Sequence, residues 1–169
     1  GLHEESESVL VLLDPLRDRL SASEAAALDR REAVMAGDLE AELRATREEF
    51  RLDPIGGAYI AGWSANRNNR PREALEYFAA YDDDLPFNRD WRAIWSARAS
   101  AYHMLGEYDA AAEVAREGRR RHPNSWTPLL AELRAISAMG REAEVDSLLE
   151  VGRTLASSTP FGLRYQTVA

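Results

Sequence analysis

The stretch WSARASAYHMLGEYDAAAEVAREGRRRHP, residues 95–123, decides the fold of this chain. Ala99 and Ala111 are small residues at the expected crossing of two helices, where a bulky side chain would force the helix axes apart. Gly106 follows the first helical run as a left-handed cap, and Pro123 follows the second run, which it cannot continue. The spacing therefore predicts a helix, a tight turn and a second helix.

The same residues fall at the positions of a 34-residue repeat when Arg92 is counted as position 1. Arg98 at position 7 and Ala115 at position 24 depart from the pattern, in which Leu and Phe are usual. The stretch resembles a tetratricopeptide repeat (TPR), and this resemblance implies an all-α fold, a right-handed superhelical array of antiparallel helix pairs. The matching positions are Trp95 (4), Ala99 (8), Tyr102 (11), Gly106 (15), Tyr108 (17), Ala111 (20) and Pro123 (32).

Extending this register along the chain predicts a single TPR-like domain over residues 1–169. Ser21 followed by Glu24 is a capping-box signature that opens the first helix pair. A capping helix precedes the pairs and a partial repeat or second capping helix follows them. The expected ranges are 6–20 for the first capping helix, about 22–52, 55–82, 89–122 and 126–156 for the pairs, and 160–169 for the last element.

The first helix pair fits the repeat least well. Arg30 and Glu42 stand at positions 8 and 20, where small residues are usual, although Gly37 takes the turn position. This pair is either divergent or shifted by one residue. The second pair fits better, and its turn at residues 66–70 contains Asn, which tolerates positive φ.

Composition limits the classes of function. The chain has 169 residues, no Cys and a net charge of −8, and all 21 of its basic residues are Arg. Residues 1–50 carry 13 acids against 6 Arg, so no concentrated basic surface is expected and no nucleic-acid partner is predicted. No stretch is long and apolar enough for membrane insertion. The localisation stays open, with a soluble, cytoplasmic domain favoured.

Two clusters of charge each allow two interpretations. The basic residues 119–122 either complement the carboxyl end of a helix dipole, which we favour, or form a patch for phosphate or an acidic partner. The acidic residues 82–84 lie in the loop at about residues 82–91 between the second and third pairs, which is three residues longer than the 34-residue spacing predicts. A solvated loop is favoured there over a cation site, because calcium needs several spaced oxygen ligands.

Sequence signatures of catalysis are absent. The chain contains no phosphate loop, dinucleotide fingerprint, HExxH or GxSxG motif. His3, His103 and His122 lie far apart in sequence, so no metal site is predicted. We therefore predict neither an enzyme nor a cofactor.

The resemblance implies that the first helix of each pair lines a concave groove through positions 2, 5, 9, 12 and 13. Aromatic rings and guanidinium groups there suit a protein or peptide ligand, in particular an acidic or carboxyl-terminated segment. The alternatives are that Tyr59 and Trp63 pack between neighbouring helices and that His103 is a surface or hydrogen-bonded helix residue with no ligand. The predicted partner-binding residues are Tyr59, Trp63, Asn66, Arg67, Ser100, His103 and Arg134, with Ser96, Ser137 and Arg31 at equivalent positions.

These features favour a noncatalytic module that mediates protein–protein or peptide binding. The carboxylate clamp of chaperone-binding TPR domains is absent, since position 5 holds Tyr59, Ser96 and Leu130. A second, looser resemblance is to TPR regions of bacterial signalling and regulatory proteins, which implies the sensory or docking region of a larger bacterial regulator. Two alternatives remain, a self-association scaffold and a helical-repeat enzyme.

Overall fold

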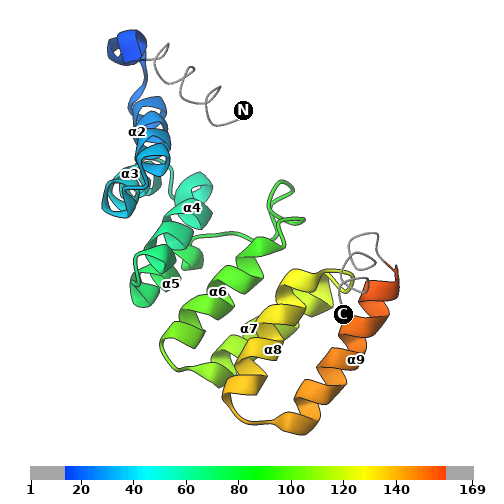
Figure 1. The fold of residues 1–169 in the computed structure, drawn as a ribbon. Coiled ribbons are helices and arrows are strands. Elements are labelled where there is room, and N and C mark those ends of the chain that lie inside the picture. Colours follow the sequence, from blue (N-terminus) through cyan, green and yellow to red (C-terminus); the bar gives the residue numbers. More distant parts are fainter. Residues whose placement is uncertain (1–13, 159–169) are drawn as a thin grey trace. The chain divides into compact units, whose positions relative to one another are not determined.

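A computed structural model describes residues 14–158 and consists of helices and their connections throughout that range (Figure 1). The chain divides into two compact units, unit 1 up to Asp82 and unit 2 from Asp83 onward. The division falls within the lengthened loop at residues 82–91. The elements of unit 1 are η1 (Asp14–Arg19), α2 (Ala22–Ala36), α3 (Leu39–Leu52), α4 (Pro54–Arg67) and α5 (Pro71–Ala79), and those of unit 2 are α6 (Ala93–Met104), α7 (Tyr108–Arg121), α8 (Trp126–Ala138) and α9 (Glu142–Ser158).

Within each unit every α-helix packs against the next one in sequence. In unit 2 the first helices of successive pairs, α6 and α8, also contact each other, as the helices of a TPR-like array do. The eight α-helices of the described residues thus confirm the predicted all-α fold of sequential helix pairs. A right-handed superhelix of the whole array stays a prediction.

The turns between paired helices follow one pattern. Gly37, Asn69, Gly106 and Gly140 all have positive φ, between 55° and 77°, and each stands at position 15 of its repeat. This left-handed geometry ends one helix and lets the next begin within a few residues. Because Gly37 also has this positive φ, the turn of the first repeat stands at position 15, and the register is not displaced by one residue there.

Ion pairs account for the two misfits of the first repeat. Glu42 is only 1% exposed, and its Oε2 accepts a hydrogen bond from Arg67 Nη1 at 2.8 Å. Arg30 Nε donates to both carboxylate oxygens of Glu49, at 2.9 and 3.0 Å. The repeat is therefore divergent in chemistry, with charge pairing where small residues are usual.

The core of unit 2 is built largely from alanine. Ala99, Ala111 and Ala115 are buried in one cluster with Leu129 and Ile136. Ala115 occupies the position at which Phe is usual, so the helices come close where a large side chain would hold them apart. Arg98, the other departure from the pattern, pairs with Asp83 at 2.7 Å.

The structure corrects one expectation next to the lengthened loop. Helix α5 ends at Ala79, earlier than the predicted 82, and the following Tyr81 is buried with its ring centroid 6.3 Å from that of Tyr59. Of the acids that follow, Asp82 and Asp84 are exposed, as expected for a solvated loop, and Asp84 also pairs with Arg121 at 3.1 Å. Asp83 is half-buried and pairs with Arg98. The lengthened loop is thus attached to α6 and α7.

The predicted capping box is confirmed at the start of α2, where Ser21 and Glu24 exchange side-chain and backbone hydrogen bonds. Of the capping helix expected at 6–20, the described part is the 3₁₀-helix η1, and residues 6–13 lie outside the described range. The element expected at 160–169 also lies outside it. None of the helices described here is long and apolar enough to cross a membrane.

Candidate functional site

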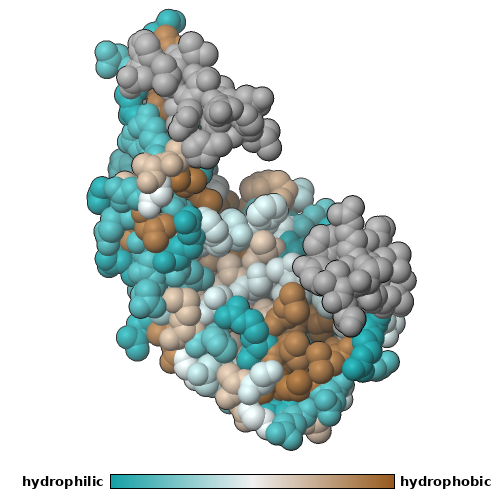
Figure 2. Space-filling view, viewed as in Figure 1, coloured by the Kyte–Doolittle hydropathy of each residue, from teal (hydrophilic) through white to brown (hydrophobic). Residues whose placement is uncertain are grey.

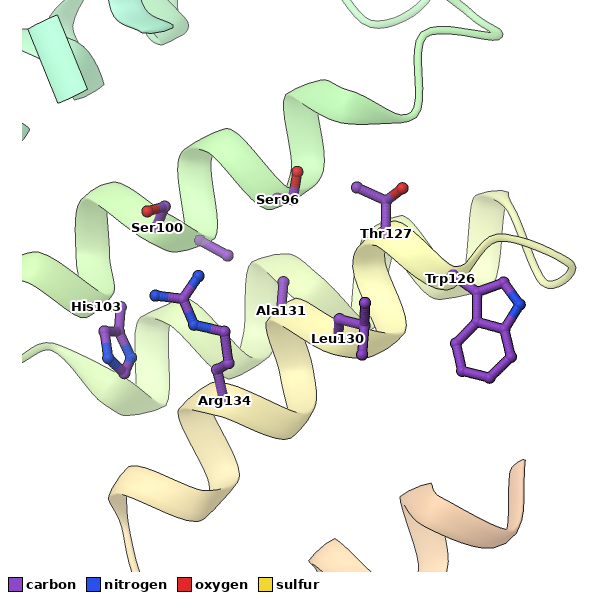
Figure 3. Close-up of a pocket in the computed structure, with 9 residues that line it drawn as sticks. Ser96, Ser100, His103, Trp126, Thr127, Leu130, Ala131 and Arg134 are labelled. Atoms are coloured by element: carbon purple, nitrogen blue, oxygen red, sulfur yellow. The ribbon is translucent and has the colours of Figure 1, made fainter. Parts of the chain in front are cut away.

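A cleft of about 390 Å³ lies in unit 2 beside helices α6 and α8 (Figure 3). Both helices are the first of their pair, and they pack against each other. The side chains that line the cleft are Ser96, Ala99, Ser100 and His103 from α6 and Trp126, Thr127, Leu130, Ala131 and Arg134 from α8.

Helical periodicity places these residues on one side of each helix. Ser96, Ser100 and His103 follow one another at steps of four and three, as do Thr127, Ala131 and Arg134, so each set shares a face. Their small members, Ala99 and Ala131 among them, leave room between the two helices. The larger side chains then stand around that space.

The apolar part of the cleft comes from α8. Leu130 is 48% exposed, although it belongs to a helix whose other face is buried in the core. Trp126 is half-buried, and its indole Nε1 has no hydrogen-bond partner within the described structure. Figure 2 shows hydrophobic surface over α8 and α9 of this unit. A ligand here would remove apolar surface from water.

The polar part of the cleft is basic. Arg134 is exposed and makes no ion pair among residues 14–158, and its guanidinium points toward α6 near Ser100 and His103 (Figure 3). His103 packs against Tyr108, with ring centroids 5.0 Å apart, and its Nδ1 is buried without a hydrogen-bond partner. Desolvation, together with the charge of Arg134, lowers the pKa of His103. The imidazole is therefore neutral at pH 7, and Arg134 supplies the positive charge.

Such a cleft can bind an anion and an apolar group side by side. Its lining contains no Asp or Glu. Among the described residues no cluster of three His, Cys, Asp or Glu could hold a metal ion. The buried acids of the two units, Glu42 and Glu132, instead accept hydrogen bonds from arginines.

The structure brings three of the predicted partner-binding residues, Ser100, His103 and Arg134, into this cleft. Ser96, which we expected at an equivalent position, also lines it, whereas Ser137 does not. The remaining four predicted residues, Tyr59, Trp63, Asn66 and Arg67, lie on α4 in unit 1.

In unit 1, the predicted residues make contacts within their own unit. The Arg67 guanidinium lies 4.6 Å from the ring centroid of Trp63, and it also pairs with the buried Glu42. Trp63 is 38% exposed, while Tyr59 is half-buried near Tyr81. Arg67 is therefore engaged in pairing with the buried Glu42 carboxylate. Of the four predicted residues on α4, Trp63 is the exposed aromatic one and is accessible to a partner.

Five lining residues were not among the residues predicted for the site, namely Ala99, Trp126, Thr127, Leu130 and Ala131. Thr127 and Leu130 occupy positions 2 and 5 of the fourth repeat, so the position rule applied evenly would have included them. Trp126 occupies position 1, which the rule does not count, and no sequence signal marks it.

The described helices form a series of helix pairs, and the cleft lies beside the first helices of two successive pairs. Residues 92–136 match the family model of the tetratricopeptide repeat, and this match spans α6, α7 and most of α8. Unit 2 thus contains a TPR repeat, a type of repeat that generally mediates protein binding. A search of curated proteins found no match to the chain.

Proposed function

We propose that this chain is a noncatalytic protein-binding module, and that the cleft of unit 2 holds an extended segment of a partner protein. The segment carries an apolar side chain next to a carboxylate, either an acidic side chain or a chain terminus. The observation that carries the proposal is the position of Arg134, an arginine with no ion pair in the described residues, beside the exposed side chain of Leu130.

The arginine supports a carboxylate ligand for two reasons. Its planar guanidinium can donate two parallel hydrogen bonds to a carboxylate, and such charge-assisted bonds are stronger than neutral ones. Other arginines near the cleft helices already form ion pairs within the protein. Arg116 and Arg119 of α7, for example, both donate hydrogen bonds to Glu132 at 2.9 Å. Arg134 is therefore the cation that a ligand of unit 2 would meet in the cleft.

The apolar lining supports a peptide over a free anion. Leu130 and Trp126 give the ligand a surface on which an apolar side chain can be desolvated, and a few such anchors supply most of the binding energy in protein interfaces. An extended segment has to offset the entropy lost on ordering, and neighbouring apolar and charged anchors do so together.

The finer parts of the proposal come from the sequence. Tyr59, Trp63, Asn66 and Arg67 of unit 1 are proposed to contact the same partner, and a soluble cytoplasmic setting is proposed with them. A place in a larger bacterial regulator rests on the looser resemblance alone. We favour the binding module over an enzyme because the cleft has no acidic residue in its lining.

The test uses pairs of fluorescein-labelled peptides in which an apolar residue is followed by Glu or by Gln, together with carboxyl-terminated and amidated versions. Fluorescence polarisation should show tighter binding of the peptide that carries the carboxylate. Arg134→Ala should abolish this difference, whereas Arg153→Ala, which removes an exposed arginine of α9 outside the cleft lining, should keep it. Equal binding of the Glu and Gln peptides by the parent protein would refute the proposal.

A further inference from the structure

A second cavity, of about 290 Å³, lies elsewhere in unit 2 and shares no residue with the cleft. It forms where the lengthened loop meets the start of α6 and the connection between α7 and α8. Its lining is polar and consists of Asp90, Arg92, Arg121, His122, Pro123, Asn124 and Ser125.

Two helix N-termini meet at this cavity. Arg92 is the N-cap residue of α6 and Ser125 is that of α8, and the two helices pack against each other. Neither N-cap side chain makes a capping hydrogen bond. The first backbone N–H groups of a helix have no partner within the helix, and with the helix dipole they favour a negative charge.

Side chains of the lining add further hydrogen-bonding groups. Ser125 is 4% exposed, and its side chain makes no capping hydrogen bond. His122 Nε2 is buried without a hydrogen-bond partner in the described structure. Leaving a buried atom such as His122 Nε2 unpaired costs free energy, which a hydrogen-bonding ligand would recover.

The two arginines of the lining, Arg92 and Arg121, differ in whether they already form ion pairs within the protein. Arg121 pairs with Asp84 at 3.1 Å and with Glu117 at 2.9 Å, and its guanidinium also lies 5.3 Å from the ring centroid of Trp95. Arg92 is exposed and makes no ion pair in the part of the chain that the structure describes. Arg121 thus supplies a fixed charge, and Arg92 supplies one that can move onto a ligand.

From this convergence we infer that the cavity is a binding site for a phosphate group. A tetrahedral oxyanion has enough acceptor oxygens for the two helix N-termini, the Ser125 hydroxyl and the Arg92 guanidinium at once, and helix N-termini are common phosphate sites. Asp90 and the carboxyl end of α7 oppose the anion, so Asp90 should limit the affinity. The site is independent of the peptide cleft, and either can fail without the other.

The basic residues 119–122 do not all have the same role. Arg119 is engaged with Glu132 and Arg120 with Glu117, and neither lines the cavity. Only Arg121 and His122 do. Arg119 and Arg120 are therefore used in ion pairs within the protein, and the phosphate interpretation applies to Arg121 and His122 alone.

The experiment is an ¹⁵N–¹H NMR titration of the full chain with inorganic phosphate at neutral pH, with sodium chloride at matched ionic strength as the reference. Saturable shifts are expected in the amide signals of residues 92–94 and 124–127. A parallel titration with O-phosphoserine, and with serine as its control, distinguishes the sources. Tighter binding of phosphoserine assigns the site to a phosphorylated side chain, and tighter binding of inorganic phosphate assigns it to the free anion.

Matched variants separate this cavity from general basic charge. Arg92→Gln should weaken phosphate binding roughly tenfold, as the loss of one charge-assisted hydrogen bond does. Arg120→Gln removes the same charge next to Arg121 but outside the lining, and should leave binding unchanged. Asp90→Asn should strengthen it, and Ser125→Ala should weaken it.

Two results would overturn the inference. One is the absence of saturable shifts, beyond the chloride reference, with both inorganic phosphate and phosphoserine. The other is a loss of binding in Arg120→Gln as large as that in Arg92→Gln, which would assign the effect to the helix end as a whole. Thermal melting of each variant shows that it is folded before its titration is interpreted.

Discussion

Gly118 of α7 lies directly against the side chain of Trp95 on α6. A Cβ atom added to Gly118 would lie 2.5 Å from Trp95 Cβ and 2.6 Å from Cγ, and 3.0 Å from Pro128 Cβ on α8. These atoms are near the backbone of their residues and cannot swing away as the end of a long side chain could. The absent side chain of Gly118 is therefore what lets α7 approach both α6 and α8.

We accordingly expect Gly118→Ala to destabilise unit 2 by about 1–3 kcal/mol, the usual cost of overpacking a core. The overpacking outweighs the gain of roughly 1 kcal/mol that alanine brings to a helix interior. Urea denaturation followed by circular dichroism measures the difference.

Gly152→Ala in α9 is the matched control for that substitution. A Cβ there would find its nearest neighbours on Trp126 and Leu129 at 3.5–3.7 Å, which is ordinary contact. We expect this variant to be as stable as the parent or more so. If both glycine variants lost stability equally, the close approach of Trp95 would not be the cause.

Glu132 supports a second prediction, because it is 3% exposed and both of its carboxylate oxygens accept hydrogen bonds, from Arg116 Nε and Arg119 Nε at 2.9 Å each. Glu132→Gln keeps the shape but replaces one charged acceptor by a donor that faces a guanidinium. The expected loss is about 1–3 kcal/mol of unfolding free energy. Glu150→Gln, at an exposed pair with Arg153, should change it by less than about 0.5 kcal/mol. Equal effects of the two variants would contradict the buried pairing.

Binding of one partner by both units is the third prediction. Trp63→Ala and Arg134→Ala should each weaken capture of the carboxylate peptide by more than roughly 1 kcal/mol, the scale of a hot-spot truncation. Trp63 tests unit 1 more cleanly than Arg67 does, because removing Arg67 would also leave the buried Glu42 unpaired. Fluorescence polarisation with each variant measures the losses. Normal binding by Trp63→Ala would confine recognition to unit 2, and loss of binding in Arg119→Ala alone would place it at the helix end.

The pH dependence of peptide binding is the fourth prediction. Desolvation and Arg134 hold the pKa of His103 below its ordinary value of about 6.5, so the free protein has a neutral imidazole at pH 7. A bound carboxylate adds a negative charge next to the ring and raises this pKa, so binding takes up a proton as the pH falls through the range between the pKa values of the bound and the free protein. Affinity should therefore rise as the medium is acidified through that range, as long as the peptide carboxylate stays ionised.

Titrations of the same peptide in buffers of decreasing pH measure this effect. His103→Gln cannot take up the proton and should show a flat profile over the same range. A rise of equal size in the parent and in His103→Gln would assign the proton to another group.

Much of the fold could be predicted because it depends on local spacing. The turn residues Gly37, Gly106 and Gly140 and the capping box at Ser21 act within one or two helical turns, and all adopt the expected geometry. The end of α5 was placed too late, since the burial of Tyr81 against Tyr59 depends on a contact with an earlier helix.

Less of the candidate site could be predicted. The position rule led to Ser100, His103 and Arg134, which line one cleft, because residues at fixed steps share a helix face. It could not tell Arg67 from Arg134. The first is paired with a buried glutamate and the second has no ion pair within the described residues, and nothing in the spacing distinguishes them.

The sequence by itself determined that this protein is an array of helix pairs with a TPR repeat in its second half, because helix periodicity, small residues and turn residues are all local signals. Only the tertiary structure decided which charges are available. Glu42 meets Arg67, and Glu132 meets Arg116 and Arg119, across neighbouring helices. The partner of a long charged side chain depends on which helix faces lie opposite each other and how closely they pack. Both are determined only when the helices pack in the folded protein.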